Sequence, residues 1–239
     1  MKTTVLGKTN KPQKKGKNLL DPIKRNRDSI KYGIDIWNVY DFMYLDKNNI
    51  PKLKVLEIQI PYESDIIVES KSMKLYLNEF YKKSFKLEKE LIIKIKKDIE
   101  SVIKNPINTK LINSFYNEPV FKSLNNTKQK FTSPNTLYKF NGFRSICPVT
   151  SQPDFANIYI FSDMTIEVDW LNKYLISFKE HGGFHEKCID EIYIKLEKKI
   201  NPNHLEVCGR FQRRGGIDIN PIRGNKKSKL FINFREFNQ

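Results

Sequence analysis

Four short stretches of the chain carry residue types whose spacing could support chemistry. The first begins at Ser145 and reads Ser-Ile-Cys-Pro-Val-Thr-Ser-Gln-Pro-Asp. It places Cys147 just before a proline, and Asp154 seven residues later, after a second proline. A pair of this kind could combine a thiolate nucleophile with a proton donor. The structural alternative is a buried cysteine beside a turn aspartate.

The second stretch, 182–188, reads Gly-Gly-Phe-His-Glu-Lys-Cys and opens a segment with helical periodicity. Glu186 would lie in the first helical turn, where acidic residues commonly complement the helix dipole. Its two carboxylate oxygens could instead accept both N–H groups on the edge of a guanine-like base. The spacing of His185 and the cysteines does not match the H-x-E and P-C-x-x-C pattern of zinc deaminases, so we expect no metal.

The third stretch, 209–221, is rich in arginine and glycine. Arg210, Arg213 and Arg214 lie within five residues of one another, although the whole chain has few arginines. The pair Gly215–Gly216 follows, and glycines allow the backbone to approach a ligand closely. These residues predict phosphate recognition. A basic hairpin on the surface is the alternative.

The fourth stretch, 68–78, joins a predicted strand end to a predicted helix. Ser70, Lys71 and Lys74 lie at this junction. The free N–H groups of a helix start, together with two lysines, could bind an anion. An ordinary capped helix would have the same appearance. Since neither GxGxxG nor GxxxxGK[ST] occurs, neither a Rossmann crossover nor a P-loop is predicted.

The elements that must position these stretches follow from hydrophobic periodicity. The alternation of apolar residues predicts strands at 33–40, 52–60, 65–68, 157–161, 165–168, 205–212 and 230–234. Helical spacing predicts helices at 72–80, 87–102, 170–179 and 184–200. Both halves therefore run strand, strand, helix, helix. The first helices share a pattern, Tyr76-Leu77-x-x-Phe80 and Tyr174-Leu175-x-x-Phe178, which favours a tandem duplication.

The same patterns divide the chain into four parts. Residues 1–28 form a predicted basic arm, and residues 29–105 form a first module. Residues 106–135 contain three prolines and no sustained period, so we expect a linker or long excursion. Residues 136–239 form a second module, which contains Cys147.

The composition indicates a basic chain with enough apolar residues for a core. Its 239 residues have a formal net charge of +16, and 39% are hydrophobic, which excludes collagen-like, disordered and membrane classes. We expect a cytoplasmic protein, since no apolar run approaches the roughly 20 residues of a membrane span and no secretory signal is recognisable. The three cysteines form no C-x-x-C pair and are expected to be free thiols.

Much of the positive charge lies at the start of the chain. Residues 1–28 carry nine basic and two acidic side chains. A basic excess of this kind is typical of nucleic-acid partners, and it is equally compatible with a solvated arm. An RNA-binding module is therefore one alternative reading of the chain.

Together, the four stretches resemble the NADPH-dependent 7-cyano-7-deazaguanine reductases, the QueF-type nitrile reductases of queuosine biosynthesis. The family motif E-S/L-K-S/A-x-K-L/Y-Y/F/W corresponds to Glu69-Ser-Lys-Ser-Met-Lys-Leu-Tyr76. It lies upstream of Cys147, which is the order of the longer, two-module subgroup. The resemblance spans about 33–223. It weakens before Gly33, where lysines replace the aromatic residues that usually follow the Leu-Gly-Lys opening.

The resemblance implies an α+β tunnelling fold (T-fold), with two tandem modules that are each an antiparallel sheet backed by two helices. It also implies a cytoplasmic homo-oligomer, a dimer, that needs no metal, no membrane and no direct contact with nucleic acid. The implied reaction converts 7-cyano-7-deazaguanine to 7-aminomethyl-7-deazaguanine with NADPH as cofactor. A metal-dependent purine- or pterin-binding hydrolase of the same fold is a second alternative.

The resemblance also implies residue roles. The Cys147 thiolate would attack the nitrile carbon to form a covalent thioimide. Asp154 would donate the proton, and its pocket should then raise its pKa so that it stays protonated. The residues implied for substrate binding are Val68, Glu69, Ser70, Phe184, His185 and Glu186. The residues implied for NADPH binding are Ser70, Lys71, Arg214 and Gly215.

Overall fold

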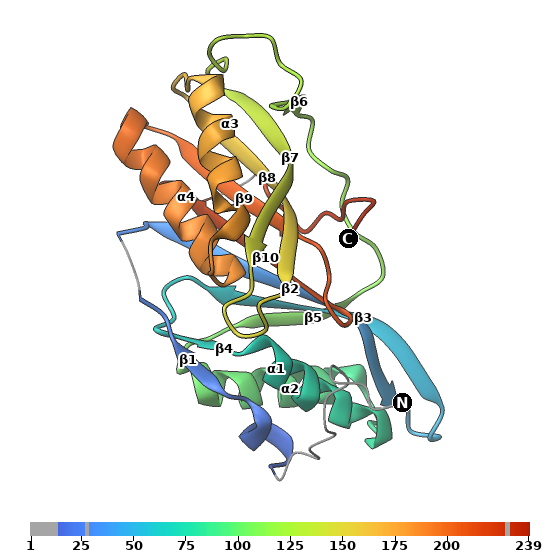
Figure 1. Cartoon of the computed structure of the whole chain (residues 1–239). Coiled ribbons are helices and arrows are strands. Elements are labelled where there is room, and N and C mark those ends of the chain that lie inside the picture. The colour runs from blue at the N-terminus through green and yellow to red at the C-terminus, as the bar shows by residue number, and fades with distance from the viewer. Residues whose placement is uncertain (1–13, 27–28, 228–229) are drawn as a thin grey trace, which may run out of the picture.

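The computed structural model describes residues 14–26, 29–227 and 230–239, and it is built around one mixed sheet (Figure 1). The strand order of that sheet is β5-β3-β2-β10-β9-β8-β7-β6. Its strands are β2 (Tyr32–Leu45), β3 (Pro51–Pro61), β5 (Asn108–Ile112), β6 (Lys122–Ser123), β7 (Thr136–Ile146), β8 (Pro153–Ser162), β9 (Leu205–Phe211) and β10 (Ile217–Gly224). All neighbours in it are antiparallel except β6 and β7. A separate antiparallel pair joins β1 (Pro22–Lys24) to β4 (Ile66–Val68).

The described residues form four α-helices, which pack in two pairs against this sheet (Figure 1). They are α1 (Ser70–Asn78), α2 (Glu88–Ile103), α3 (Val168–Ile176) and α4 (His185–Ile200). Short 3₁₀ turns cover Gly16–Leu19, Glu79–Lys82 and Ser177–Glu180. The first pair of helices lies with β2, β3 and β5, and the second pair lies with β7 to β10. The molecule is therefore an α+β protein.

Of the three apolar clusters among the described residues, two lie between the helix pairs and the sheet. In the first core, α2 contributes a buried residue at each third or fourth position, namely Leu91, Ile95, Ile99 and Ile103. In the second core, α4 contributes Ile189, Ile192, Tyr193 and Leu196. Alternate residues of the strands face the same way, as Leu56, Ile58 and Ile60 of β3 show. This periodicity is the reason that the helix predictions at 72–80, 87–102, 170–179 and 184–200 are confirmed.

The opposite face of the sheet is covered by residues 231–239 through buried polar contacts. Asn233 donates to Oδ1 of Asn38 at 2.8 Å. Asn157 donates to Oε2 of Glu236 at 2.9 Å. Asn38 and Asn157 are therefore hydrogen-bonded, as most buried polar groups are, whereas the guanidinium group of Arg210 lies over the Phe234 ring and its nitrogens have no hydrogen-bond partner among the described residues.

Two strand predictions are wrong. Residues 165–168 do not form a strand, because helix α3 begins at Val168 and Glu167 makes only an isolated bridge with Phe131. Residues 230–234 make a single bridge, between Phe234 and Tyr116, and are otherwise held by side chains. Of the predicted basic arm, residues 1–13 and 27–28 lie outside the described residues.

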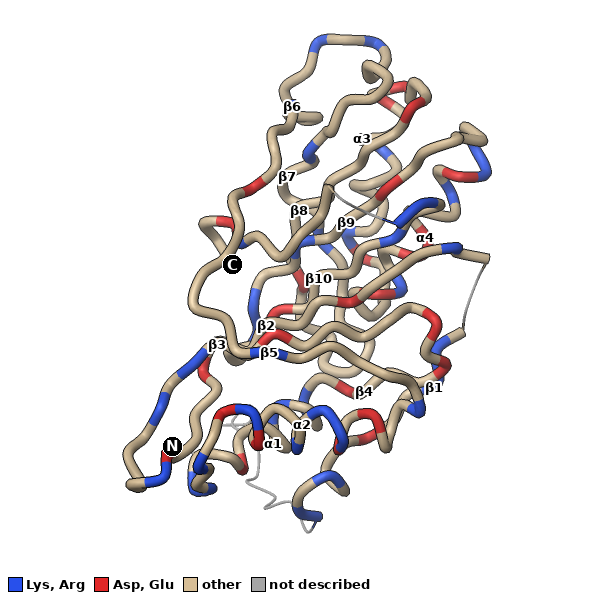
Figure 2. Tube along the Cα trace, turned by 180° about the vertical axis from the view of Figure 1, so that it is seen from behind, with Lys and Arg blue, Asp and Glu red and all other residues tan. Residues whose placement is uncertain are grey.

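Basic and acidic residues are interspersed along the trace around α1 and α2 (Figure 2). None of the helices in the described ranges combines the length and the apolar character that a bilayer crossing requires.

Candidate active site

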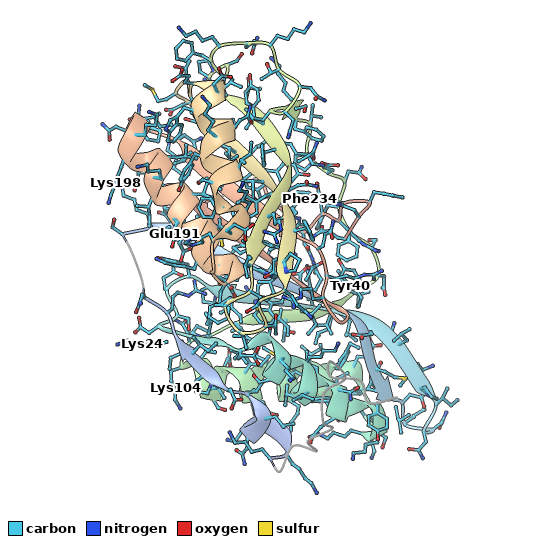
Figure 3. All side chains as sticks on the ribbon, in the orientation of Figure 1. Lys24, Tyr40, Lys104, Glu191, Lys198 and Phe234 are labelled. Carbon is cyan, nitrogen blue, oxygen red and sulfur yellow. The ribbon has the colours of Figure 1, made fainter. Side chains whose placement is uncertain are left out.

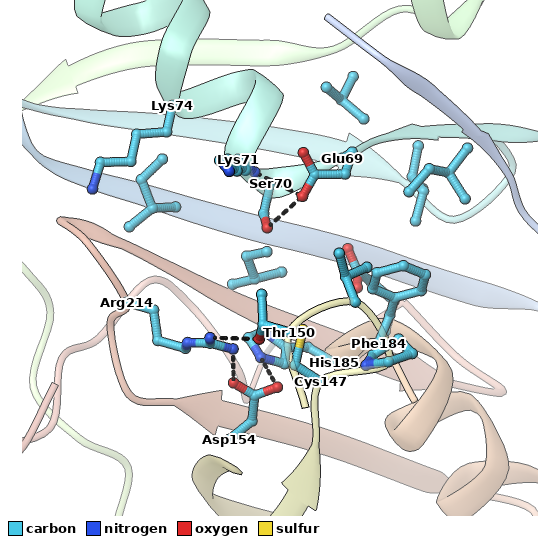
Figure 4. A pocket seen from close by; sticks show the side chains of 18 of the residues that line it. Glu69, Ser70, Lys71, Lys74, Cys147, Thr150, Asp154, Phe184, His185 and Arg214 are labelled. Carbon is cyan, nitrogen blue, oxygen red and sulfur yellow. Dashed lines mark hydrogen bonds and ion pairs between the residues drawn. The ribbon is translucent and has the colours of Figure 1, made fainter. Parts of the chain in front are cut away.

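A cavity of about 250 Å³ lies where four connections meet (Figure 4). Its walls are the start of α1, the β7–β8 turn, the start of α4 and the β9–β10 turn. Three apolar side chains that line it come from neighbouring strands, Trp37 of β2 and Ile217 and Ile219 of β10. All four stretches singled out in the sequence therefore border one cavity.

Ten of the predicted site residues line this cavity. They are Val68, Glu69, Ser70, Lys71, Cys147, Asp154, Phe184, His185, Glu186 and Arg214. Gly215 lies beside it, in the β9–β10 turn, with a positive φ of 59°. A Cβ on Gly215 would overlap Nζ of Lys74, which itself lines the cavity. The positive φ is what favours glycine here, because the flexible end of the Lys74 side chain can move away from an added Cβ.

Cys147 is held in a tight turn between β7 and β8. Its amide donates to the carbonyl of Gln152, and its carbonyl accepts from the amide of Ser151, both at 2.9 Å. The end of β7 also pairs with the chain before α4. The amide of Ile146 donates to His181, and its carbonyl accepts from Gly183. This pairing brings the cysteine next to the start of α4, although the two are far apart in sequence.

The surroundings of Cys147 favour its thiolate. Burial acts to raise the pKa of this thiol, but hydrogen bonds from Thr150, from the Val149 amide and from Arg214 outweigh burial and lower the pKa. The other cysteines behave in the opposite way, because burial raises the pKa of both Cys188 and Cys208 to about 12. All three are free thiols. Cys147 is thus the one of the three suited to nucleophilic attack.

Asp154 is buried at the start of β8 and has two partners. Nη1 of Arg214 donates to its Oδ1 at 2.7 Å, and Nε2 of His185 lies 3.3 Å from its Oδ2. Burial acts to raise the pKa of Asp154, but His185 and Arg214 outweigh it and lower the pKa. The expectation of a raised pKa is therefore wrong for this structure. The reason is that both partners stabilise the carboxylate.

His185 and Glu186 open α4 with different environments. The His185 ring stacks on Phe211, with ring centres 4.0 Å apart and planes 12° apart. Nδ1 of His185 has no hydrogen-bond partner among the described residues. Glu186 is buried, and burial together with the negative charge of Asp35 raises its pKa. A ligand that donates hydrogen bonds would stabilise the ionised form of Glu186.

The start of α1 faces the same cavity. Glu69 caps the helix by accepting from the amides of Lys71 at 2.9 Å and Ser72 at 2.7 Å. Its side chain is therefore engaged, while Lys71 and Lys74 extend from the helix as Figure 4 shows. With Arg214 on the facing wall, three cations border one cavity. This cation set suits a cofactor with phosphate groups, such as NADPH.

The sequence did not indicate which side chains hold Arg214 in place. Its Nη2 donates to the Thr150 hydroxyl at 3.0 Å, and it also donates to Gln152. Both residues lie in the turn after Cys147, and the only sequence feature that pointed to them was their place between the two prolines.

Trp37 was predicted as a strand residue, and nothing in the sequence indicated that it lines the cavity. Within the described ranges, His, Cys, Asp and Glu form no group of three that could hold a metal ion.

The fold and the site define an α+β protein with an activated cysteine in a partly cationic cavity. The chain matches the family model described as nitrile reductase, 7-cyano-7-deazaguanine-reductase N-term, over residues 12–111. A second model, QueF-like protein, matches residues 153–230.

Two relatives carry the name NADPH-dependent 7-cyano-7-deazaguanine reductase. The protein from Buchnera aphidicola subsp. Schizaphis graminum is 34% identical over 251 residues, which cover 90% of this chain and 95% of the relative. The protein from Hahella chejuensis is 31% identical over 257 residues, or 94% of each chain. The chain therefore belongs to the family of NADPH-dependent 7-cyano-7-deazaguanine reductases, and the predicted resemblance is confirmed.

Proposed function

We propose that this chain reduces the nitrile of 7-cyano-7-deazaguanine to the aminomethyl group of 7-aminomethyl-7-deazaguanine, with NADPH, in queuosine biosynthesis. Family membership supports the reaction. The main structural support for the reaction is the position of Cys147. Its thiol has a lowered pKa, and it lies in one cavity with Asp154 and Glu186. A nitrile carbon is an electrophile that a thiolate can attack.

Substrate binding is assigned to the start of α4 and the segment before α1. The Glu186 carboxylate would accept N–H groups from the six-membered ring, and His185 would contact the same edge. Backbone groups of Val68, Glu69 and Ser70 would bind from the opposite wall. The ring of Phe184 lines this part of the cavity and is available for stacking on the base.

The first chemical step is assigned to Cys147. Its sulfur forms a bond to the nitrile carbon, and one electron pair of the C≡N bond moves to nitrogen, which takes up a proton to give a thioimide. Asp154 and His185 lie in contact and would deliver that proton. Because Arg214 and His185 stabilise the Asp154 carboxylate, Asp154 must take up a proton before it can donate one to the nitrogen.

Reduction to the amine requires two hydrides, and NADPH supplies them when bound. Ser70, Lys71, Arg214 and Gly215 are assigned to hold its phosphate-bearing part, with Lys74 beside them. The covalent bond to Cys147 would retain the intermediate until the first hydride has been transferred. The sulfur then leaves as thiolate, and the resulting imine accepts the second hydride and a proton.

We also propose that the fold is a T-fold of two tandem modules, with residues 29–105 and 136–239 as modules, 106–135 as linker and 1–28 as arm. Support comes from the repeated helix pattern. Tyr76 and Phe80 contact edge-on with ring centres 5.4 Å apart and planes at 81°. Tyr174 and Phe178 have the same separation, with planes at 77°. Equal geometry at equivalent positions favours a duplication.

A cytoplasmic homodimer is proposed as the working form. Apolar side chains that are strongly exposed in the single chain include Val120 and Phe237. Residues of this type are common in the buried centre of interfaces between identical subunits. Sedimentation equilibrium of the purified protein gives the number of subunits directly.

The reaction is tested by its stoichiometry. We expect two NADPH to be oxidised per 7-aminomethyl-7-deazaguanine formed, measured by absorbance at the cofactor band and by chromatography of the product. Cys147→Ala should abolish both signals while the thermal melting curve is retained. A chelator should leave the rate unchanged. Absence of NADPH oxidation with wild-type protein and fresh substrate would contradict the proposal.

A further inference from the structure

Two paired strands give the cavity an apolar floor. Trp37 of β2 lies opposite Ile219 of β10, and both line the cavity together with Ile217. Trp37 is 1% exposed, and its indole Nε1 has no hydrogen-bond partner among the described residues. A buried indole N–H usually donates to an acceptor. An acceptor on a ligand in the cavity would give Trp37 this missing hydrogen bond.

Strand β2 runs from the proposed substrate side of the cavity toward its cationic side. At the substrate side, Nη2 of Arg223 lies 2.8 Å from Oδ1 of Asp35, and Nε of Arg223 donates to Asp190 of α4 at 2.5 Å. Asp190 follows Glu186 by one helical turn, so these ion pairs hold the start of α4 near Asp35. Because alternate residues of a strand face the same way, Trp37 follows Asp35 on the same face of the sheet.

The cationic side is reached at Tyr40, which is labelled in Figure 3. The Tyr40 amide donates at 2.8 Å to the carbonyl of Gly216, in the turn that carries Arg214. Arg214 and Lys74 line the cavity from facing walls. A strand advances about 3.3 Å per residue, so Trp37 lies about 7 Å from the substrate end of this stretch and about 10 Å from Tyr40. Trp37 therefore lies between the groups that suit the substrate and the groups that suit phosphate.

We infer that Trp37 binds the nicotinamide ring of NADPH: its indole N–H donates to the carboxamide oxygen, and Ile217 and Ile219 contact the ring. The inference deepens the proposed function and rests on it. The reduced nicotinamide ring is flat and uncharged, which suits an apolar floor, and its carboxamide oxygen is a hydrogen-bond acceptor. A ring held at Trp37 lies between the cations and Cys147, which is where hydride transfer to a cysteine-bound intermediate requires it.

The base of the substrate is the other flat ring that enters this cavity. Its hydrogen-bonding edge is assigned to Glu186 and His185, and Phe184 immediately precedes them and is available for stacking. Trp37 is thus not needed for the nitrile to bind or to react with Cys147. This difference separates the two candidate occupants, because the covalent adduct of the proposed function forms without NADPH.

The chain has two tryptophans, which allows a direct test of contact. Trp170 lies in α3, stacks on Tyr174 and is not among the residues that line the cavity, so Trp170→Phe is the matched control for Trp37→Phe. NADP⁺ does not absorb tryptophan emission, so its pyridinium ring quenches an indole only by contact. We expect saturating NADP⁺ to quench the fluorescence of Trp170→Phe, which keeps Trp37, by at least half, and that of Trp37→Phe by less than a tenth. 2′-Phospho-ADP-ribose, which carries the phosphates without nicotinamide, should quench neither.

The hydrogen bond is tested by affinity. Calorimetric titration without nitrile gives the dissociation constants of NADPH and of its thionicotinamide analogue, whose sulfur is a weak acceptor. We expect Trp37→Phe to weaken NADPH at least 5-fold and the analogue less than 2-fold, and Trp170→Phe to equal wild type. Adduct formation with 7-cyano-7-deazaguanine, followed by intact-protein mass spectrometry, should be unchanged in Trp37→Phe. Thermal melting verifies folding.

Equal quenching of the two variants by bound NADP⁺, or no quenching of either, overturns the inference, and so does equal weakening of NADPH and its analogue. Weaker adduct formation in Trp37→Phe at unchanged NADPH affinity would assign Trp37 to the base, which also overturns it. The fluorescence test holds even if Trp37→Phe does not fold, because Trp170→Phe retains Trp37. If wild type neither forms the adduct nor binds NADPH, the proposed function fails and the inference falls with it.

Discussion

The reactivity of Cys147 depends on the residues of its own turn. The Thr150 hydroxyl has two contacts there: it hydrogen-bonds the Cys147 sulfur and accepts from Arg214. A side chain in this position links the proposed nucleophile to a cation of the facing turn. Thr150 therefore contributes to the lowered pKa of Cys147, in addition to the Val149 and Thr150 backbone amides.

We predict that Thr150→Val raises the pKa of Cys147. Thiolate is the reactive form, and its fraction rises as pH passes upward through the pKa, so the variant should react more slowly at pH 7 and reach its plateau at higher pH. Alkylation by iodoacetamide between pH 5 and 10, followed by peptide mass spectrometry, gives the titration curve. Thr165→Val, at an exposed position outside the cavity, is the control. Superimposable curves for Thr150→Val and wild type would contradict the role of the hydroxyl.

The sequence predicted the types of the residues in the site but not the charge states of their side chains. The motifs singled out Cys147, Asp154 and Glu186, and all three line one cavity. The pKa of Asp154 was predicted in the wrong direction. Its partners His185 and Arg214 are 31 and 60 residues away in sequence, so their contact with Asp154 depends on the whole fold.

Helix α4 is positioned by its contact with β9. A Cβ on Gly209 would lie 2.7 Å from Cδ1 of Ile189 and 2.8 Å from the Phe211 ring, which are both closer than carbon atoms approach in proteins. Glycine therefore sets the distance between the helix and the strand. Since α4 begins with His185 and Glu186, this packing also places the proposed substrate-binding side chains.

We predict that Gly209→Ala displaces α4 and lowers the free energy of unfolding by about 1–3 kcal/mol, the usual range for overpacked cores. Half-maximal adduct formation with the nitrile should require more substrate. Urea denaturation and the adduct assay measure the two effects. Gly182→Ala is the control, because nothing lies within 4 Å of its added Cβ. An unchanged unfolding free energy for Gly209→Ala would refute the packing argument.

Strands β7 and β10 were not predicted because the apolar alternation in each of them is interrupted. Strand β10 alternates apolar and polar residues from Ile217 to Asn220, but Pro221 interrupts the pattern, and a proline inside a run argues against a strand. Those polar side chains are buried, with partners such as Asn38 for Asp218. In β7 the alternation is interrupted where the register with β8 shifts between Phe140 and Phe143. Helices were predicted better, because their buried faces are apolar over several turns.

The halves of the molecule are joined at the β2–β10 pair and at the buried charges around it. Asp35 of β2 contacts Arg223 of β10, which in turn contacts Asp190 of α4. Asp35, which is completely buried, thus pairs with two arginines, of which Arg223 also pairs with Asp190. Removal of one partner from a buried ion pair leaves a charge without compensation.

We predict that Asp35→Asn lowers the free energy of unfolding by about 3–5 kcal/mol, as is typical for a broken buried pair. Chemical denaturation measures this free energy. Lys96→Gln, which breaks a partly exposed pair with Glu100, should cost about 1 kcal/mol or less.

Arg223 and Arg25 lower the pKa of Asp35 despite its burial. Its contribution should be complete above pH 4 and be lost as pH falls through the lowered pKa. Equal stabilities of Asp35→Asn and wild type would contradict this role.

Cys147 is proposed to form a covalent thioimide with the nitrile. The most direct measurement is the intact mass of the protein after addition of 7-cyano-7-deazaguanine without NADPH, for wild type beside Cys147→Ala and Cys188→Ala. We expect a gain of one substrate mass on wild type and Cys188→Ala, no gain on Cys147→Ala, and loss of the adduct as the amine once NADPH is added. An unmodified wild-type mass at saturating nitrile, or an equal adduct on Cys147→Ala, would contradict the covalent role of Cys147.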